Sequence, residues 1–249
     1  MFEDVRYEDV NREERHYCAL LMHAVLSSKT YRMRAVSLLN EGTQAQLDAD
    51  DLQVFLEASL LRDYWHALGR PANRAEVRGR RRSVVVEALR AQGLGESLMG
   101  EDFFWTTSER TIAWYPGVWR YKSIRATSLD EKTRQKLSDL RTAFKAIPDL
   151  LFLSPGSAVY VEAKLESGEG KDGRGYTQFN NLHQIARLTK LLVPSLADGI
   201  VDCALLTRSR AAVQPADMAS LLWKDFLPRG ADRLDSFTSR GLQRAASAA

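Results

Sequence analysis

The sequence predicts an α/β fold in which an all-α N-terminal domain precedes a mixed-sheet core. Apolar residues recur at helical spacing through the first 95 residues, whereas aromatic, β-branched and alternating apolar residues are typical of the chain that follows. Three glycines between Gly93 and Gly100 mark this change. We therefore expect a helical domain over 1–95, a second domain over 96–235, and a polar tail over 236–249.

The helices of the first domain are predicted from apolar spacing and from the residues that end them. Residues 11–40 carry apolar side chains at helical intervals. Ser27 and Ser28 interrupt the pattern, so two helices and one kinked helix both fit, and Gly42 is a suitable stop. A glycine ends the next predicted helix and a proline begins the one after it. These two helices span 50–68 and 71–92.

The second domain is predicted to alternate strands and helices, and the small, polar tail is expected to fray. In chain order we expect strands over 102–124 with a turn at Pro116-Gly117, a helix at 128–146, strands at 149–153 and 158–165, a glycine-rich loop at 167–175, a helix at 177–192, a strand at 199–206 and a helix at 216–226.

Composition limits the class of protein. The 249 residues suit one large domain or two small ones, and the net charge of +3 means that any polyanion must bind to a local patch. No apolar run approaches the roughly 20 residues of a membrane span, and the N-terminus is acidic where a secretory signal would be basic. We expect a cytoplasmic protein with no membrane partner. Cys18 and Cys203 lie in apolar surroundings and are expected to be buried free thiols.

The segment IPDLLFLSPGSAVYVEAK carries the chemistry. Side chains alternate along a strand, so Glu162 and Lys164 point to one face, with Tyr160, while the apolar side chains between them point to the core. The turn Ser154-Pro155-Gly156-Ser157 is suited to fold this strand back along the preceding one. The hairpin would bring Asp149 near Glu162.

Two carboxylates and an ammonium are suited to phosphodiester cleavage. One or two carboxylates suffice to hold Mg²⁺ (or Mn²⁺) beside a phosphate, because the ion keeps several of its waters. Asp149, Glu162 and the carbonyl of Ala163 are the predicted ligands. Lys164 could orient or deprotonate the attacking water, and its charge offsets the negative charge that develops.

Pro148-Asp149 followed by Glu162-Ala163-Lys164 resembles the PD-(D/E)xK motif of the restriction-endonuclease-like nucleases. The resemblance covers roughly residues 100–210. It implies a core of αβββαβ order, provided that a strand lies upstream, with Asp149 and Glu162 as metal ligands and Lys164 as the catalytic lysine.

The resemblance also implies residues on the neighbouring helices. Many members of the family add a glutamate from the preceding helix, for which Glu131 is the nearest candidate and Asp139 an alternative. Exonuclease-like branches place a glutamine one helix later, where this chain has Gln178. They follow it with a tyrosine, but this chain has Leu182 at that position. An endonuclease is therefore favoured over an exonuclease.

Two other segments are candidate nucleic-acid contacts. An arginine-rich helix would place Arg74, Arg78, Arg81 and Arg82 on one face, either to follow phosphates or as a solvated, salt-bridged surface. The loop with Lys171 and Arg174 could clamp the backbone or be only a flexible connection. A cluster of aromatic residues favours core packing over base stacking. Its members are Trp105, Trp114, Tyr115, Trp119 and Tyr121.

We therefore expect a metal-dependent endonuclease that acts on DNA. The family's habits suggest a homodimer or a subunit of a larger assembly, in restriction, repair or antiviral (phage) defence. Two alternatives stay open, a non-catalytic nucleic-acid-binding or assembly module and an RNA-directed nuclease. A bland structural interpretation of the motif is also open, with Glu162 and Lys164 as a solvent-exposed pair and Pro148-Asp149 as a turn that ends a helix.

Overall fold

The computed structural model describes residues 14–69, 75–94, 115–118, 130–165, 175–208 and 219–247. The chain forms two compact units. Unit 1 consists of Met1–Ala58, Pro148–Phe179 and Ile200–Ala249, and unit 2 consists of Ser59–Ile147 and Asn180–Gly199. Each unit combines segments that are distant in sequence, so the units do not follow the consecutive division into 1–95 and 96–235 that the sequence predicts.

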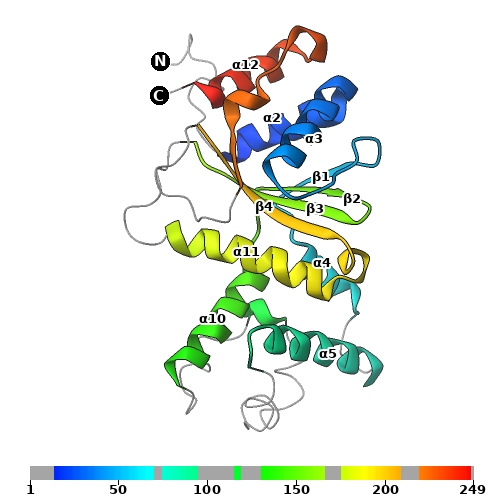
Figure 1. Ribbon diagram of the computed structural model, residues 1–249, viewed down its shortest axis with the longest axis vertical. Helices are drawn as coiled ribbons and strands as arrows, with labels where there is room; N and C mark the ends of the chain where they lie inside the picture. The colour runs from blue at the N-terminus through cyan, green and yellow to red at the C-terminus, as the bar shows by residue number, and fades with distance from the viewer. Residues whose placement is uncertain are drawn as a thin grey trace, which may run out of the picture. The chain divides into compact units, whose positions relative to one another are not determined.

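Within the described residues of unit 1, five strands form one mixed sheet in the order β1-β2-β3-β4-β5 (Figure 1). The strands are β1 (Gln53–Leu56), β2 (Leu150–Ser154), β3 (Ser157–Ala163), β4 (Ile200–Thr207) and β5 (Ala219–Leu222). β2 runs antiparallel to both of its neighbours, β1 and β3, and β4 and β5 continue the sheet in parallel with β3. The predicted mixed α/β class is confirmed.

The predicted hairpin is present as β2 and β3. Its turn is Pro155-Gly156, between the paired residues Ser154 and Ser157. Gly156 has a φ of 70°, a conformation that glycine adopts without steric cost. Tyr160 is fully buried although it shares the face of Glu162, so the prediction of a polar face on β3 is wrong at this residue. The polar part of that face is confined to the end of the strand.

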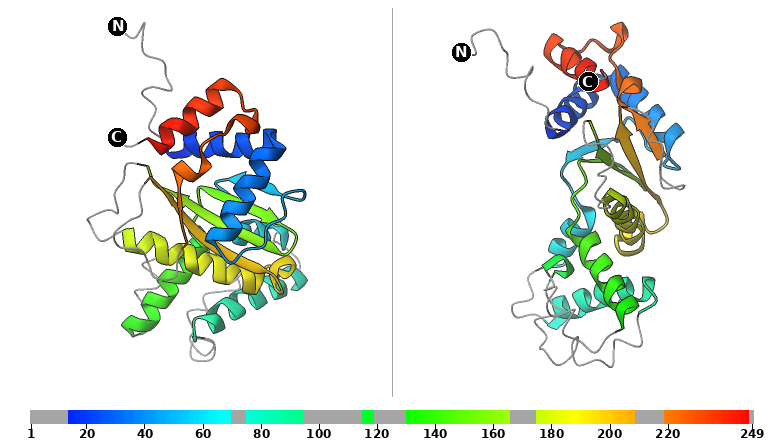
Figure 2. Two further views of the ribbon diagram at one scale, coloured as in Figure 1. Left: turned by 45° about the horizontal axis from the view of Figure 1, so that its top comes forward. Right: turned by 90° about the vertical axis from the view of Figure 1, so that its left-hand side faces the viewer.

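Three helices, α2 (Glu14–Ser27), α3 (Lys29–Gly42) and α12 (Ser236–Ala246), pack on one face of the sheet (Figure 2). The chain breaks between α2 and α3 at Ser28, whose side chain accepts a hydrogen bond from the N–H of Tyr31 and caps α3. The sequence therefore encodes two helices and not one kinked helix, and α3 ends at Gly42 as predicted.

Two predicted helices are strands over part of their length. Residues 53–56, within the helix predicted at 50–68, form β1, where Val54 is buried and Phe55 is exposed. The spacing of the apolar residues fits both structures, and pairing with β2 decides the outcome. The helix predicted at 216–226 is instead β5, paired with β4, followed by the short 3-10 helix η3 (Trp223–Phe226).

The predicted polar tail is an ordered helix over most of its length. Asp235 caps α12 by accepting a hydrogen bond from the N–H of Thr238. Leu242 and Ala245 are buried in the core that α2 also lines. The expectation that this segment frays is therefore wrong for Ser236–Ala246.

Unit 2 is helical in its described residues and has its own aromatic core. It contains α4 (Leu60–Ala67), α5 (Ala75–Ala91), η1 (Pro116–Val118), α10 (Glu131–Lys145), most of α11 (Gly175–Leu192) and η2 (Pro194–Leu196). Tyr115 packs edge-on against Phe144, and both lie near Trp65. These contacts support a packing role for Tyr115, a member of the predicted aromatic cluster. Of the segment 102–124, where strands and a turn at Pro116-Gly117 are predicted, only residues 115–118 are described, and Pro116–Val118 form η1. The rest of that segment and of the aromatic cluster falls outside the described residues. No helix in the described part of the chain is long and apolar enough to span a membrane.

Candidate active site

Asp149 lies directly before β2 and is bound to the end of β3. The register pairs Leu150 with Val161, so residue 149 falls opposite the last residues of β3. Asp149 Oδ2 accepts a hydrogen bond of 2.8 Å from the backbone N–H of Ala163. This contact holds the Asp149 carboxylate beside the end of the strand that carries Glu162.

Asp149 is also held from β1. Its carbonyl oxygen accepts a hydrogen bond of 3.1 Å from the N–H of Glu57, the residue that follows β1. Glu57 has a φ of 48°, in the left-handed region that non-glycine residues seldom adopt. Its side chain pairs with Arg15 at 2.5 Å. The backbone of Asp149 is therefore fixed between two strands.

Glu162 and Lys164 form an ion pair at the end of β3. Lys164 Nζ donates to Glu162 Oε1 across 3.0 Å, and each side chain is about one-fifth exposed (20% for Lys164 and 19% for Glu162). The backbone N–H of Lys164 donates to the carbonyl of Leu206 on β4, which fixes the main chain there. The predicted Glu–Lys pair is thus partly buried and not a freely exposed surface pair.

Glu14 joins the site, although the sequence does not predict it. It is the first residue of α2, and its Oε1 accepts a hydrogen bond of 3.0 Å from the N–H of Leu165. Its Oε2 lies 3.5 Å from Lys164 Nζ. The resemblance implies a glutamate on the helix before the strand pair, where the sequence offers Glu131 and Asp139, whereas Glu14 belongs to α2, before β1. The sequence predicts a helix at 50–68 in place of β1, so it does not show that α2 and α3 are the helices before the first strand. Glu14 is not predicted for this reason.

Burial and neighbouring charges shift the pKa values of Asp149, Glu162 and Lys164. Burial, with the nearby carboxylates of Glu14 and Glu57, raises the pKa of Asp149 against the opposing effects of the Ala163 N–H and Lys164. Burial and then the charge of Asp149 raise the pKa of Glu162. Burial by itself would lower the pKa of Lys164, but the neighbouring carboxylates, Glu162 foremost, outweigh it and raise that pKa.

Cys18 lies one turn after Glu14 on α2 and is buried. Burial, followed by the charges of Asp149 and Glu14, raises the pKa of its thiol. A thiol that stays protonated is a poor nucleophile. Cys18 and Cys203 are both buried and free, as predicted.

The described residues contain no group of three or more His, Cys, Asp or Glu side chains that could hold a metal ion. The structure brings Asp149 and Glu162 to one end of the hairpin, and Lys164 occupies the space between Glu162 and Glu14. Asp149, Glu162 and the carbonyl of Ala163 stay the predicted ligands.

Several other predicted site residues lie elsewhere or outside the described residues. Gln178 lies in the first turns of α11, and its side chain is outside the described part. Arg74, Lys171 and Arg174 also fall outside the described residues. Glu131 and Asp139, the alternatives for the helical glutamate, belong to α10 of unit 2 and have local partners there. Glu131 pairs with Arg134, and Asp139 accepts a hydrogen bond from Gln135.

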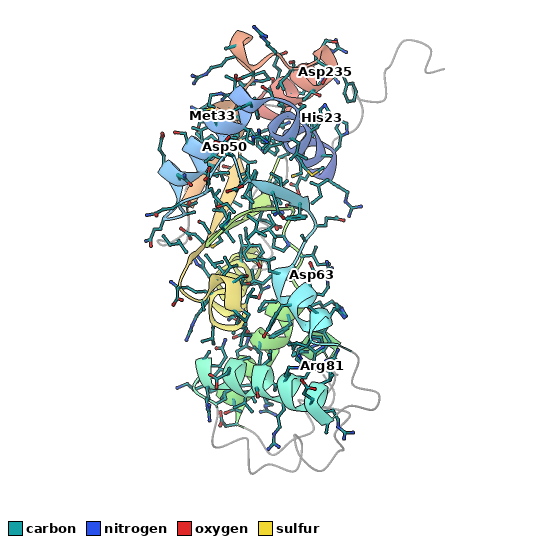
Figure 3. The ribbon with its side chains drawn as sticks, turned by 90° about the vertical axis from the view of Figure 1, so that its right-hand side faces the viewer. His23, Met33, Asp50, Asp63, Arg81 and Asp235 are labelled. Carbon is teal, nitrogen blue, oxygen red and sulfur yellow. The ribbon has the colours of Figure 1, made fainter. Side chains whose placement is uncertain are left out.

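Arg81, which is labelled in Figure 3, is a buried residue of α5 and interrupts the predicted arginine face. Arg81 is buried, with its guanidinium 4.9 Å from the centre of the Trp65 ring and donating to the carbonyl of Gly69. Burial also lowers its pKa. Arg82 is exposed and Arg78 is half-buried. The inclusion of Arg81 in an exposed phosphate-binding face is therefore wrong, because Arg81 packs inside unit 2.

No protein-family model, curated protein or solved structure matches this chain.

Proposed function

We propose that unit 1 is a metal-dependent DNA nuclease of the restriction-endonuclease-like type. One observation carries this proposal: Asp149, Glu162 and Lys164 meet at one end of the β2–β3 hairpin, where Glu14 also contacts Lys164. Two carboxylates and an ammonium in a partly buried site are the groups that phosphodiester hydrolysis with a bound Mg²⁺ or Mn²⁺ requires.

The order of elements supports this fold. The helices α2 and α3 precede three antiparallel strands, β1, β2 and β3, and α11 then leads to β4, which is parallel to β3. With the inserted helices set aside, this order is consistent with the αβββαβ order that the resemblance implies, with β1 as the upstream strand, although most of α11 belongs to unit 2. The helices α4, α5 and α10 come between β1 and β2 in the chain and belong to unit 2.

The carboxylates suit a divalent cation. One oxygen of Asp149 accepts from the Ala163 N–H and one oxygen of Glu162 accepts from Lys164, which leaves the second oxygen of each for a ligand role. The raised pKa values of Asp149 and Glu162 indicate that the charged forms are destabilised, and a cation would relieve this. When bound, it would polarise a phosphoryl oxygen and lower the pKa of a bound water.

Lys164 acts in this proposal as an ammonium held by two carboxylates. Its raised pKa keeps Nζ protonated at neutral pH. Glu162 and Glu14 hold Nζ from two different elements, which fixes its position. There it would donate a hydrogen bond to a phosphate oxygen or to the attacking water, and its charge would offset the negative charge that develops on the phosphate.

Cleavage assays test this proposal. The purified protein is incubated with supercoiled plasmid, linear duplex DNA, single-stranded DNA and single-stranded RNA, each with Mg²⁺, Mn²⁺ or EDTA. We expect cutting of DNA that requires the metal. We expect the rate to fall by about 10²–10⁴ in Lys164→Ala, and Asp149→Ala to be inactive. Asp51→Asn, at an exposed residue, is the matched control and should cut like the wild type.

Other outcomes would assign a different function. Cutting in EDTA, or full activity in Asp149→Ala and Lys164→Ala, would contradict the site assignment. Cutting of RNA without cutting of DNA would favour the RNA-directed nuclease. Metal-independent binding of nucleic acid with no cutting of any substrate would favour the non-catalytic module. The observation that supports this alternative is that Lys164 already forms ion pairs with Glu162 and Glu14.

A further inference from the structure

The two units carry opposite net charges, a difference that the total of +3 conceals. Residues of unit 2 include 19 Lys and Arg and 11 Asp and Glu, a net charge of +8. Residues of unit 1 include 16 Lys and Arg and 21 Asp and Glu, a net charge of −5. The charge therefore separates along the boundary between the compact units, although each unit is assembled from several segments of sequence.

A negative unit with carboxylates at its site repels a polyanion. Phosphate backbones bind to proteins mainly through Lys and Arg, which release the condensed counterions. We propose that unit 2 is a nucleic-acid-binding module that holds the sugar–phosphate backbone, while unit 1 carries the reactive groups. This inference rests on the proposed function for the identity of the polyanion, and it assigns the binding to a different set of residues.

Unit 2 exposes lysines that have no partner among the described residues. They lie on α10 and α11, and three are exposed while the fourth, Lys136, is half-buried. The set is Lys132, Lys136, Lys145 and Lys190. No ion pair or hydrogen bond in the described part of the chain engages their ammonium groups. By contrast, Arg90 and Arg134 are each bound to a glutamate one turn away. These four lysines can contact phosphates without first breaking an ion pair.

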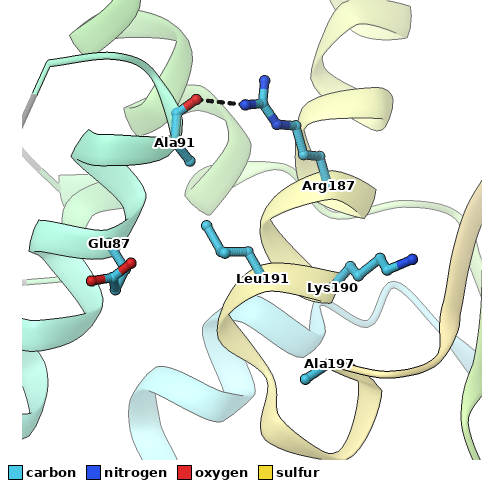
Figure 4. Close-up of a pocket in the computed structure, with 6 residues that line it drawn as sticks. All are labelled: Glu87, Ala91, Arg187, Lys190, Leu191 and Ala197. Atoms are coloured by element: carbon cyan, nitrogen blue, oxygen red, sulfur yellow. Dashed lines mark hydrogen bonds between the residues drawn. The ribbon is translucent and has the colours of Figure 1, made fainter.

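Cations also line an open pocket of about 480 Å³ within unit 2, between α5 and the end of α11 (Figure 4). Arg187 lines it and donates a hydrogen bond of 2.6 Å to the carbonyl of Ala91, which fixes the guanidinium at the end of α5. Lys190 lies one turn further along α11. The one acidic residue of the lining, Glu87, is already bonded to Arg90. The pocket therefore adds a positive surface to that of α10.

This arrangement predicts binding that is independent of base sequence. Ammonium groups on helix surfaces contact phosphates as point charges and do not read base edges. Arg81, which the sequence places on the contact face, is excluded because it packs on Trp65. The proposed binding surface is therefore formed by the lysines of α10 and α11, and Arg81 is not part of it.

Binding of the full chain to a fluorescent duplex DNA in EDTA tests this inference without any cleavage. Fluorescence anisotropy gives Kd between about 50 and 200 mM salt. The test variant carries Lys132→Gln, Lys136→Gln, Lys145→Gln and Lys190→Gln. The control variant removes four exposed charges from unit 1, at Lys29, Lys224, Arg233 and Arg240. Circular dichroism and thermal unfolding establish that both variants are folded.

We expect the test variant to bind at least about tenfold more weakly and its log–log salt slope to fall by about two to four, since each phosphate contact contributes about 0.9. The control should stay within about twofold of the wild type. The same assays with single-stranded DNA and RNA identify which backbone is held. Equal losses in both variants, no loss in the test variant, or binding to anionic lipid vesicles without binding to nucleic acid would overturn the inference. Binding through unit 2 without cutting would support the binding role of unit 2 and refute the proposed nuclease activity. Cutting with no loss of binding in the test variant would support the nuclease activity and refute the binding role of unit 2.

Discussion

The Glu14 carboxylate on α2 accepts a hydrogen bond of 3.0 Å from the backbone N–H of Leu165, which lies just beyond β3. The other oxygen of the same carboxylate lies 3.5 Å from Lys164 Nζ. One side chain thus joins the first turn of α2 to the end of the strand that carries the reactive groups. The docking of α2 on the sheet and the position of Lys164 are therefore coupled.

Glu14→Ala should destabilise the protein and Glu14→Gln should do so less. Alanine leaves the Leu165 N–H without its acceptor, which costs about 1–3 kcal/mol, whereas glutamine keeps an oxygen at that position. Urea unfolding measures the free energy of unfolding. Glu41→Ala, at an exposed residue of α3, is the control and should change it by less than about 0.5 kcal/mol. Equal effects of Glu14→Ala and Glu41→Ala would show that the contact with Leu165 is unimportant for stability.

Asp149→Asn and Glu162→Gln should each stabilise the metal-free protein at neutral pH. The folded state raises the pKa of both carboxyl groups, so it binds protons more tightly than the unfolded chain does. Stability from this source is present at low pH and is lost as pH rises from the unfolded values, about 3.9 for Asp and 4.3 for Glu, through the raised folded values. The neutral amides do not incur this loss.

Thermal unfolding in EDTA between about pH 5 and pH 8 checks this expectation. The Tm of both variants should exceed that of the wild type towards the upper end of this range, and the difference should shrink on acidification. The control Asp51→Asn, at an exposed residue, should follow the wild type at every pH. Wild-type Tm values above those of both variants at neutral pH would mean that the charged carboxylates stabilise the fold.

Replacing Lys164 by methionine should destabilise the protein at neutral pH, and replacing it by arginine should do so less. Methionine removes the cation that compensates Glu162 and Glu14. Because the folded state raises the pKa of Lys164, its stabilisation is fully present below the unfolded value of about 10.4 and is lost as pH rises through the folded value. Urea unfolding at neutral pH measures the effect, with Lys224→Met as the exposed control. Equal stability of Lys164→Met and Lys224→Met would contradict the assigned charge network.

The C-terminal helix should be part of the cooperative fold. Leu242 on α12 is 1% exposed, so Leu242→Ala should lower the free energy of unfolding by about 2–5 kcal/mol. Gln243→Ala, at the exposed neighbouring residue, should change it by less than about 0.5 kcal/mol. Hydrogen exchange should also show protected amides in α12. Rapid exchange throughout α12, with a neutral Leu242→Ala, would favour the frayed tail that the sequence predicts.

The part of the site that the sequence predicts depends on local information. Pro155-Gly156 specifies the turn, and the alternation along β3 separates Glu162 and Lys164 from the core residues between them. Once the hairpin closes in register, Asp149 must lie opposite the end of β3. No residue outside this hairpin is needed for that prediction, which is why it could be made from one sequence.

The remainder depends on contacts between distant segments. Val54 and its neighbours in β1 have apolar spacing that also fits a helix, and their partner strand β2 lies far along the chain. Without β1, the sequence does not identify the helix that precedes the first strand, so it offers Glu131 and Asp139 and does not predict Glu14. Arg81 likewise has the spacing of an exposed face, but the aromatic surface of Trp65 holds it in the interior of unit 2.

The binding of a divalent cation by Asp149 and Glu162 is the claim on which the proposed chemistry depends. Isothermal titration of Mn²⁺ into the wild type, Asp149→Asn and the exposed control Asp51→Asn tests it without any substrate. We predict that the wild type and the control bind Mn²⁺ alike, and that Asp149→Asn binds it more than about tenfold more weakly. Equal Mn²⁺ affinity in all three proteins, or no binding by the wild type, would contradict a metal centre at this end of the hairpin.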